Sequence, residues 1–145
     1  MAISTYSTIY SNTQSTIIGI LRSASGLQGI KIVDGGVSDL LRGRGTDLIS
    51  VHTPTSDEEI MTKTKMRITL TDRIEIITFK ESACRTIADL VHAALFDNQD
   101  TTRAARLFRY RSRRSDLAIG DLPTQTGNRT MYTITLSAEY EYRGD

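Results

Sequence analysis

The segment from Asn128 to Arg143 alternates between apolar and polar side chains almost without interruption. From Tyr132 to Tyr142 the apolar residues hold the even-numbered positions, and Thr, Ser and Glu hold the odd-numbered ones. A period of two over this length predicts a long β-strand with one dry face and one solvated face. The strand is roughly two to three times as long as the usual five or six residues, so we expect part of it to project beyond the sheet of its own domain.

A second long alternating strand is predicted from Met66 to Lys80. Its dry face is interrupted by Asp72, which predicts either a bulge or a strand tip that leaves the core at that point. The apolar residues that define this face are Met66, Ile68, Leu70, Ile74 and Ile76.

Two segments have the spacing of amphipathic helices. In the first, from Tyr6 to Ala24, apolar side chains recur every three or four positions, and a Ser-Gly pair follows as a stop signal, with Gly26 expected in the left-handed conformation. The second begins at Ser82, the expected N-cap, and ends near Asn98. Its apolar stripe consists of Ile87, Leu90, Val91, Ala94 and Leu95.

Shorter strands are predicted at 30–33, 47–53 and 105–113. Loops are predicted at 37–45, 55–65 and 115–127, the second of them as an extended loop or a flexible hairpin tip. The expected fold is α+β, with a mixed or antiparallel sheet of about five strands and two amphipathic helices packed on one face. The expected order is α-β-β-β-α-β-β, in a single domain over residues 1–145.

Composition narrows the class of protein. The formal net charge is +1, which is far from the basic balance of an autonomous nucleic-acid binder. A single cysteine excludes an internal disulfide framework. No apolar run is long enough to cross a bilayer, and no Lys or Arg precedes Arg22, so we expect a soluble protein made inside the cell, without a signal peptide.

Candidate catalytic and metal-binding residues are few and scattered. Cys84 shares a helical face with apolar residues, and the two histidines, His52 and His92, lie far apart in the sequence. The acidic run Asp57-Glu58-Glu59 has no neighbour that would desolvate one carboxylate, and Gly43-Arg44-Gly45 lacks the Lys-Ser/Thr ending of a phosphate loop. We therefore predict a protein that is not an enzyme and that binds no metal or cofactor.

An arginine-rich run extends from Arg103 to Arg114, with Phe108 and Tyr110 among the arginines. One interpretation is a small nucleic-acid-binding module that contacts phosphates and stacks bases on the two rings. Alternation, however, puts both rings on the face opposite to the odd-numbered arginines, and therefore toward the core. We favour ion pairs between these arginines and acidic side chains, either on the closing strand or on another subunit.

The order of elements resembles that of the tail-terminator or tail-completion proteins of long-tailed bacteriophages. In these proteins an opening helix is followed by a short strand that ends in an Asp-Gly-like turn, here 30–35. A long strand similar to 73–79 then leads into a helix similar to 87–91, and an alternating strand similar to 132–142 closes the chain. The resemblance covers nearly the whole sequence.

This resemblance implies a structural virion protein without covalent chemistry. Proteins of this family form a ring, usually of six subunits, at the head-proximal end of the tail, where the ring stops tube polymerisation and joins the tail to the connector. The implied partners are other copies of the chain, the tail-tube protein and a head-side connector or neck protein, with DNA passing through the ring and no membrane contact. The implied location is the virion tail or neck, after assembly in the host cytoplasm. Another neck or tail-tube structural protein is the alternative.

The predicted contact surface lies on the solvated faces of the long strands, together with the loops at 34–47 and 54–65. Its charged residues are expected to contact another subunit or a partner protein. These residues are Arg67, Arg73, Glu75, Arg109, Arg111, Arg113, Glu139, Glu141 and Arg143.

Overall fold

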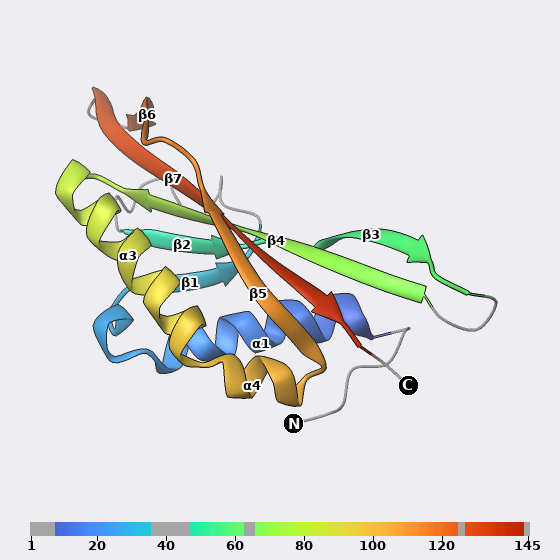
Figure 1. Ribbon diagram of the computed structural model, residues 1–145. Coiled ribbons are helices and arrows are strands. Elements are labelled where there is room, and N and C mark those ends of the chain that lie inside the picture. The colour runs from blue at the N-terminus through green and yellow to red at the C-terminus, as the bar shows by residue number, and fades with distance from the viewer. Residues whose placement is uncertain (1–7, 36–46, 63–65, 125–126, 144–145) are drawn as a thin grey trace.

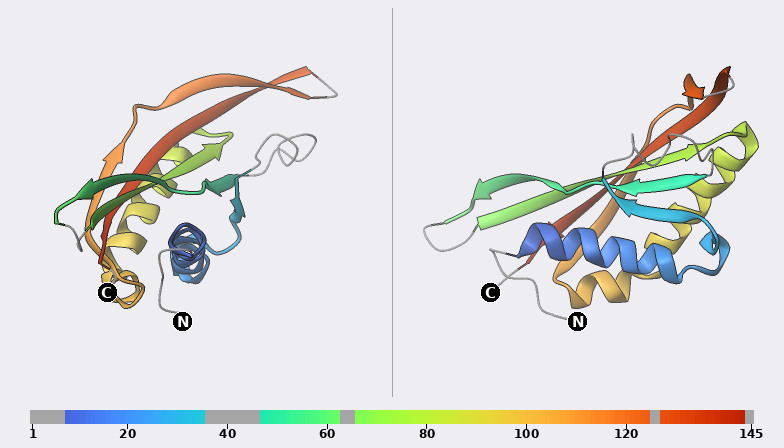
Figure 2. Two further views of the ribbon diagram at one scale, coloured as in Figure 1. Left: turned by 90° about the vertical axis from the view of Figure 1, so that its right-hand side faces the viewer. Right: turned by 180° about the vertical axis from the view of Figure 1, so that it is seen from behind.

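The computed structural model describes residues 8–35, 47–62, 66–124 and 127–143, and within them one mixed sheet is covered by helices on one face (Figures 1 and 2). The expected α+β class, with helices on one side of a sheet, is confirmed. The helices are α1 (Ile9–Ser23), η1 (Ser25–Leu27), α3 (Glu81–Asp97) and α4 (Gln99–Ala104). The strands are β1 (Lys31–Asp34), β2 (Leu48–Val51), β3 (Thr55–Ile60), β4 (Met66–Thr78), β5 (Leu107–Arg114), β6 (Ala118–Thr124) and β7 (Gly127–Tyr142).

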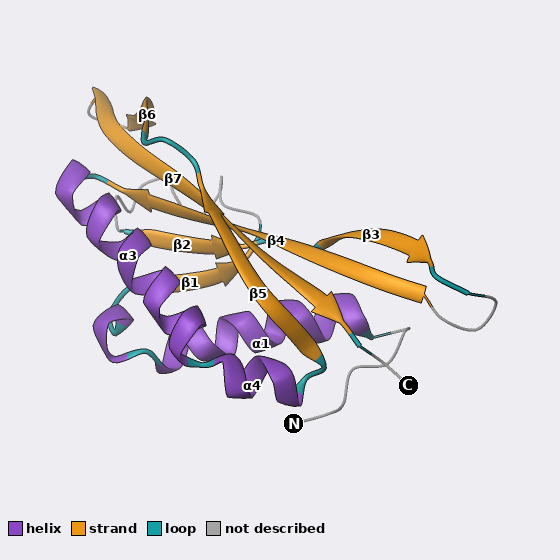
Figure 3. Ribbon diagram, in the orientation of Figure 1, coloured by secondary structure: helices purple, strands orange, loops and turns teal. Residues whose placement is uncertain are grey.

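The two long strands predicted from alternation, β4 and β7, form the centre of the sheet. They are antiparallel, and their register runs without a break from Ile68 opposite Tyr142 to Thr78 opposite Tyr132. Each is long enough to carry two short strands end to end on its other edge: β2 and β3 on β4, and β5 and β6 on β7 (Figure 3). The strand β1 adds to β2 in the parallel direction, which makes the sheet mixed.

The core lies between the even-numbered face of β4 and β7 and the helices α1 and α3. Each fully buried Leu or Ile side chain in such a core stabilises the fold by about 1.5–3 kcal/mol relative to exposure. The buried residues include Ile17 and Leu21 of α1, Val91 and Leu95 of α3, Leu70, Ile74 and Ile76 of β4, and Ile134 and Leu136 of β7.

The helix ends differ from the sequence prediction. The residue before α3 is Lys80, in extended conformation, so Ser82 lies inside the first turn and is not the N-cap. Gly26 is not left-handed, because the chain turns there through η1; Gly29, at φ 86°, takes the positive angle instead. A Cβ on Gly26 would come within 3.0 Å of the Leu90 side chain, so this glycine permits close packing of η1 on α3.

Two of the predicted loops contain strands. Segment 55–60 is β3 and segment 118–124 is β6, although neither shows apolar alternation. β3 pairs with the part of β4 that extends past β2, and β6 pairs with the part of β7 that extends past β5, where the backbone groups on that edge are available for hydrogen bonding. The short helix α4 is a further element that the sequence pattern did not predict. The predicted loop at 37–45 lies outside the described residues.

Asp72 contradicts the prediction of a bulge or of a strand tip leaving the core. The register of β4 with β7 continues through it, opposite Ala138, and the residue is fully buried. Neither carboxylate oxygen has a hydrogen-bond partner, and the hydroxyl of the buried Tyr140 also lacks one, within the described residues. Burial raises the pKa of Asp72 to about 8, so the carboxyl group is neutral in the folded protein at pH 7.

Replacing Asp72 by Asn is expected to stabilise the protein at neutral pH. The Asp72 carboxyl titrates near pH 4 when unfolded and near pH 8 when folded, so folding takes up a proton between these values. Stability of the wild type therefore falls as pH rises through this window, by about 1.4 kcal/mol per unit. Asp72→Asn removes this term, for a gain of about 4 kcal/mol at pH 7.

Urea unfolding at several values between pH 5 and pH 8 measures this difference. Asp100→Asn is the matched control, because Asp100 is exposed on α4 and its replacement should leave the pH dependence of unfolding as in the wild type. Wild type and Asp72→Asn curves that run parallel across the window would contradict a neutral buried carboxyl.

Candidate subunit interface

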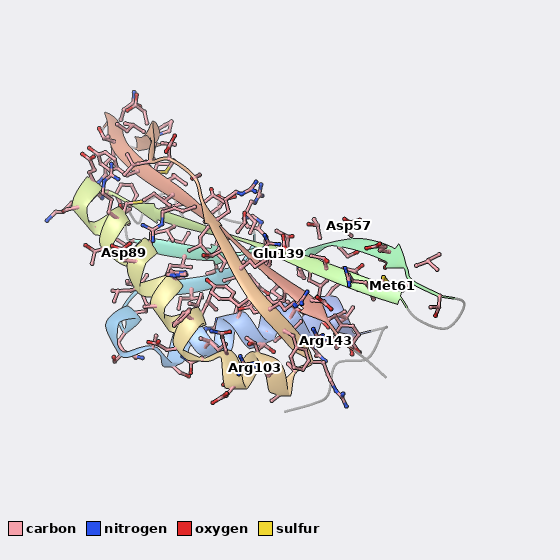
Figure 4. The ribbon with its side chains drawn as sticks, viewed as in Figure 1. Asp57, Met61, Asp89, Arg103, Glu139 and Arg143 are labelled. Carbon is pink, nitrogen blue, oxygen red and sulfur yellow. The ribbon has the colours of Figure 1, made fainter. Side chains whose placement is uncertain are left out.

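The face of the sheet opposite the helices carries the charged side chains predicted for the contact surface, of which Figure 4 labels Glu139 and Arg143. Because side chains alternate along a strand, the odd-numbered residues of β4 and β7 all point to this outer face. The same parity continues on β3, where Asp57 is opposite Thr69 and Glu59 is opposite Arg67. The outer face is therefore polar over β5, β3 and the paired parts of β4 and β7. Toward the β6 end it becomes apolar, where Ile77 and Leu48 are buried in a small cluster with Met131.

Arginines of β5 and glutamates of β7 form ion pairs on this face. Nη1 of Arg109 lies 3.5 Å from Oε2 of Glu141, and Nη1 of Arg111 lies 3.6 Å from Oε1 of Glu139. Nε of Arg143 lies 3.3 Å from the other Glu141 oxygen. The arginine side chains are between half and four-fifths exposed, so each pair is expected to stabilise the monomer by less than about 1 kcal/mol.

A β-bulge in β5 separates the two aromatic rings of the arginine-rich run. The register shifts between Phe108 and Arg111, and Arg109 adopts a left-handed φ of 56°. Phe108 consequently lies on the outer face, with the Arg143 guanidinium 5.1 Å from its ring centre. Tyr110 turns to the core side. The prediction that both rings face the core is wrong for Phe108, because β5 offers no glycine to signal the bulge.

The remaining arginines of the run point in different directions. Arg114 reaches α3, where its Nη1 lies 2.7 Å from Oδ1 of Asp89. Arg103 lies on α4 and pairs with Asp100 at 3.6 Å. Arg113 is on the outer face, opposite Ser137, and has no ion pair within the described part of the chain. The run therefore does not form one continuous basic strip, which weakens the nucleic-acid interpretation.

The charged residues predicted on β4 have ion-pair partners just after β2, on β3 and on β4 itself. Nη2 of Arg73 lies 3.3 Å from Oε1 of Glu75, and Nε2 of His52 lies 3.0 Å from the same oxygen. Arg67 lies farther along β4 and pairs with Glu59 of β3 at 3.9 Å. The nine predicted residues thus share one face, and the ion pairs place eight of them in four separate sets, with Arg113 in none among the described residues. His52 was missed as a member of this surface.

A polar contact on the helix side of the sheet was also missed. Nδ1 of His92, on α3, lies 3.1 Å from the hydroxyl of Tyr110 and 3.2 Å from that of Ser112. Neither residue pair is near in sequence, so only the packing of α3 on β5 brings them together.

Cys84 is buried, and burial raises the pKa of its thiol, so the thiolate is disfavoured. Within the described ranges no three His, Cys, Asp or Glu side chains group to hold a metal ion.

The two edges of this surface differ in charge. The strand β3 is exposed along its whole length and includes the acidic run Asp57-Glu58-Glu59. It extends away from the helices as one half of an arm formed with β4 (Figure 1), and Ile60 and Met61 near its end are 78% and 50% exposed. The other edge is β5, which carries Arg111 and Arg113 beyond the bulge.

Comparison with known proteins finds similarity among solved structures but not among sequences. No protein-family model matches the sequence, and no curated protein matches it. One similar solved structure is described as "Virion of native gene transfer agent (GTA) particle". The similarity has a TM-score of 0.49 and 17% sequence identity over 97% of this chain and 100% of that chain. Values of this size do not assign a function.

One structural feature bears on membranes. Among the helices in the described ranges, none combines the length and the apolar character needed to cross a bilayer.

Replacing Arg109 by Gly is expected to leave the fold as stable or to stabilise it. Arg109 adopts a left-handed φ, which costs a residue with a Cβ about 1–2 kcal/mol, and glycine avoids that cost. The ion pair that it loses is exposed and weak. Arg111→Gly is the matched control, because Arg111 lies in the same strand without a positive φ, and glycine there should destabilise the fold by about 1 kcal/mol. Thermal unfolding of the two variants tests this, and equal destabilisation would contradict the bulge.

Proposed function

We propose that this protein is a structural component of a phage tail, which forms a ring at the head-proximal end, terminates tube assembly and joins the tail to the connector. The supporting structural observation is that β4 and β7 are long enough to carry further strands on both sides, and that two of these, β3 and β5, form the outer edges of the sheet in the described part of the chain. The specific role comes from the resemblance of the element order and the alternating strands to tail-terminator proteins.

Exposed sheet edges favour assembly. An edge strand presents unpaired backbone N–H and C=O groups, which readily pair with another chain. The strand β3 shows this condition clearly, since all six of its residues are exposed and its far end extends beyond α1 (Figure 2). A closed ring removes such edges by pairing each with the next subunit.

The outer face is suited to contacts between proteins. Its charged groups, including Arg111 with Glu139 and Arg73 with Glu75, neutralise each other in the monomer through exposed pairs. Such pairs are weak, so a partner can replace them at little cost. Exposed Ile60 and Met61 add an apolar contact near the end of the arm. Tail-tube protein and a head-side connector protein are the partners that fit the proposed position.

Self-association of the purified protein tests this function. We expect closed rings of a single subunit number, visible by native mass spectrometry and by light scattering over a wide concentration range. The ring should also bind the tail-tube protein of the same virion. A neck protein of the same virion would form rings without binding tube ends, and a tube protein would form open tubes. A monomer that persists at all concentrations and does not bind tail-tube protein would contradict the proposal.

A further inference from the structure

Two opposite edges of the sheet carry opposite charge. The acidic edge is β3, with Asp57 and Glu59 on the outer face, and the basic edge is β5, with Arg111 and Arg113 on the same face. Figure 4 shows Asp57 on the arm, away from the helices. Both edges lie at the ends of one row of strands, β3-β4-β7-β5.

From this arrangement we infer that β3 of one copy of the chain pairs with β5 of the next copy, so that one sheet continues from subunit to subunit. The inference rests on the proposed ring and identifies the joint that would hold it. The occupant of each edge is a second copy of this chain, because the copy supplies the complementary charge itself.

Strand directions agree with such a joint. Each neighbouring pair in the row β3-β4-β7-β5 is antiparallel. If the outer face continues across the joint, β3 of one subunit is therefore antiparallel to β5 of the next. No strand has to reverse, and the alternating pattern of the row is preserved through every subunit.

Side-chain spacing also agrees. Asp57 and Glu59 are two residues apart on the outer face, as are Arg111 and Arg113. In an antiparallel register that places Asp57 opposite Arg113, Glu59 is opposite Arg111, so both pairs join opposite charges. The bulge at Arg109 interrupts β5, so the paired segment begins after it, at Arg111.

The charges also exclude the competing arrangements. Two β3 edges would place acidic side chains opposite each other, and two β5 edges would place arginines opposite each other, and both are unfavourable. Only the head-to-tail joint brings acid to base. A head-to-tail joint closes into a ring when the rotation between subunits permits, which is the symmetry that the proposed function requires.

Formation of the joint exchanges two weak ion pairs for two new ones, and the released Glu139 and Arg67 side chains are 39% and 43% exposed, so both can be solvated. Arg111 gives up its exposed ion pair with Glu139, at 3.6 Å, and pairs with Glu59 of the next copy. That Glu59 gives up its own ion pair with Arg67, at 3.9 Å. Asp57 and Arg113 form no ion pair within the described residues, and the joint gives each a partner. Backbone hydrogen bonds along β3 supply the rest of the attraction.

Charge-reversal variants test the joint. Asp57→Lys with Glu59→Lys makes both edges basic, and Arg111→Glu with Arg113→Glu makes both edges acidic. Each double variant alone should raise the concentration for half-assembly by about tenfold or more, because like charges replace opposite charges at the joint. Mixing the two variants should restore assembly, since each then supplies the edge that the other lacks. The chain that carries all four substitutions should assemble like the wild type.

Matched controls reverse the same number of charges on the helices. Asp97→Lys with Asp100→Lys, and Arg85→Glu with Arg103→Glu, should assemble like the wild type. Circular dichroism and thermal unfolding establish that each variant is folded. If the arginine variant does not fold, the Asp57→Lys, Glu59→Lys variant still decides between assembly and monomer.

The outcomes separate this joint from the function. A wild type that forms rings, with double variants that assemble equally well or mixtures that fail to restore assembly, would overturn the joint and leave the ring proposal intact. A wild type that remains monomeric and does not bind tail-tube protein would overturn both.

Discussion

The structure depends on the antiparallel pairing of β4 with β7. Eleven consecutive residue pairs join them, from Ile68 with Tyr142 to Thr78 with Tyr132, and the register has no break. A slip of one residue would turn the apolar face of a strand into solvent and its charged face into the core, so burial fixes the register. The short strands attach to the outer edges of this pair, and α1 and α3 cover its even-numbered face.

Sequence patterns predicted those elements that have one buried face and one exposed face. The long strands and both amphipathic helices could be predicted because their apolar residues recur with the period of a strand or a helix. The strand β3 was missed since all its residues are exposed, and backbone pairing with the overhang of β4 leaves no apolar signal. Asp72 was misread for the opposite reason: a carboxyl inside an apolar face normally signals exposure, whereas here the surrounding ladder holds it in the core.

The candidate interface could be predicted in part, namely where strand alternation alone decides which face a side chain lies on. Alternation placed the odd-numbered arginines of β5 and the glutamates of β7 on one face, and the structure contains the ion pairs of Arg109 and Arg111. Alternation put Phe108 on the wrong face, because the β-bulge depends on the left-handed conformation of Arg109. No glycine in β5 indicates that conformation from the sequence. The ion pair between Arg114 and Asp89 could not be predicted from alternation either, since it forms only when α3 packs on the sheet.

The two faces of the long strands are suited to separate tasks. Even-numbered side chains such as Ile74 and Leu136 are fully buried under the helices and supply most of the stability of the fold. Odd-numbered side chains such as Arg73 and Glu139 form exposed pairs that add little to that stability. Substitutions on the outer face can therefore change association while the monomer stays folded. Because a strand repeats every two residues, a single pair of strands can specify both a core and an assembly surface.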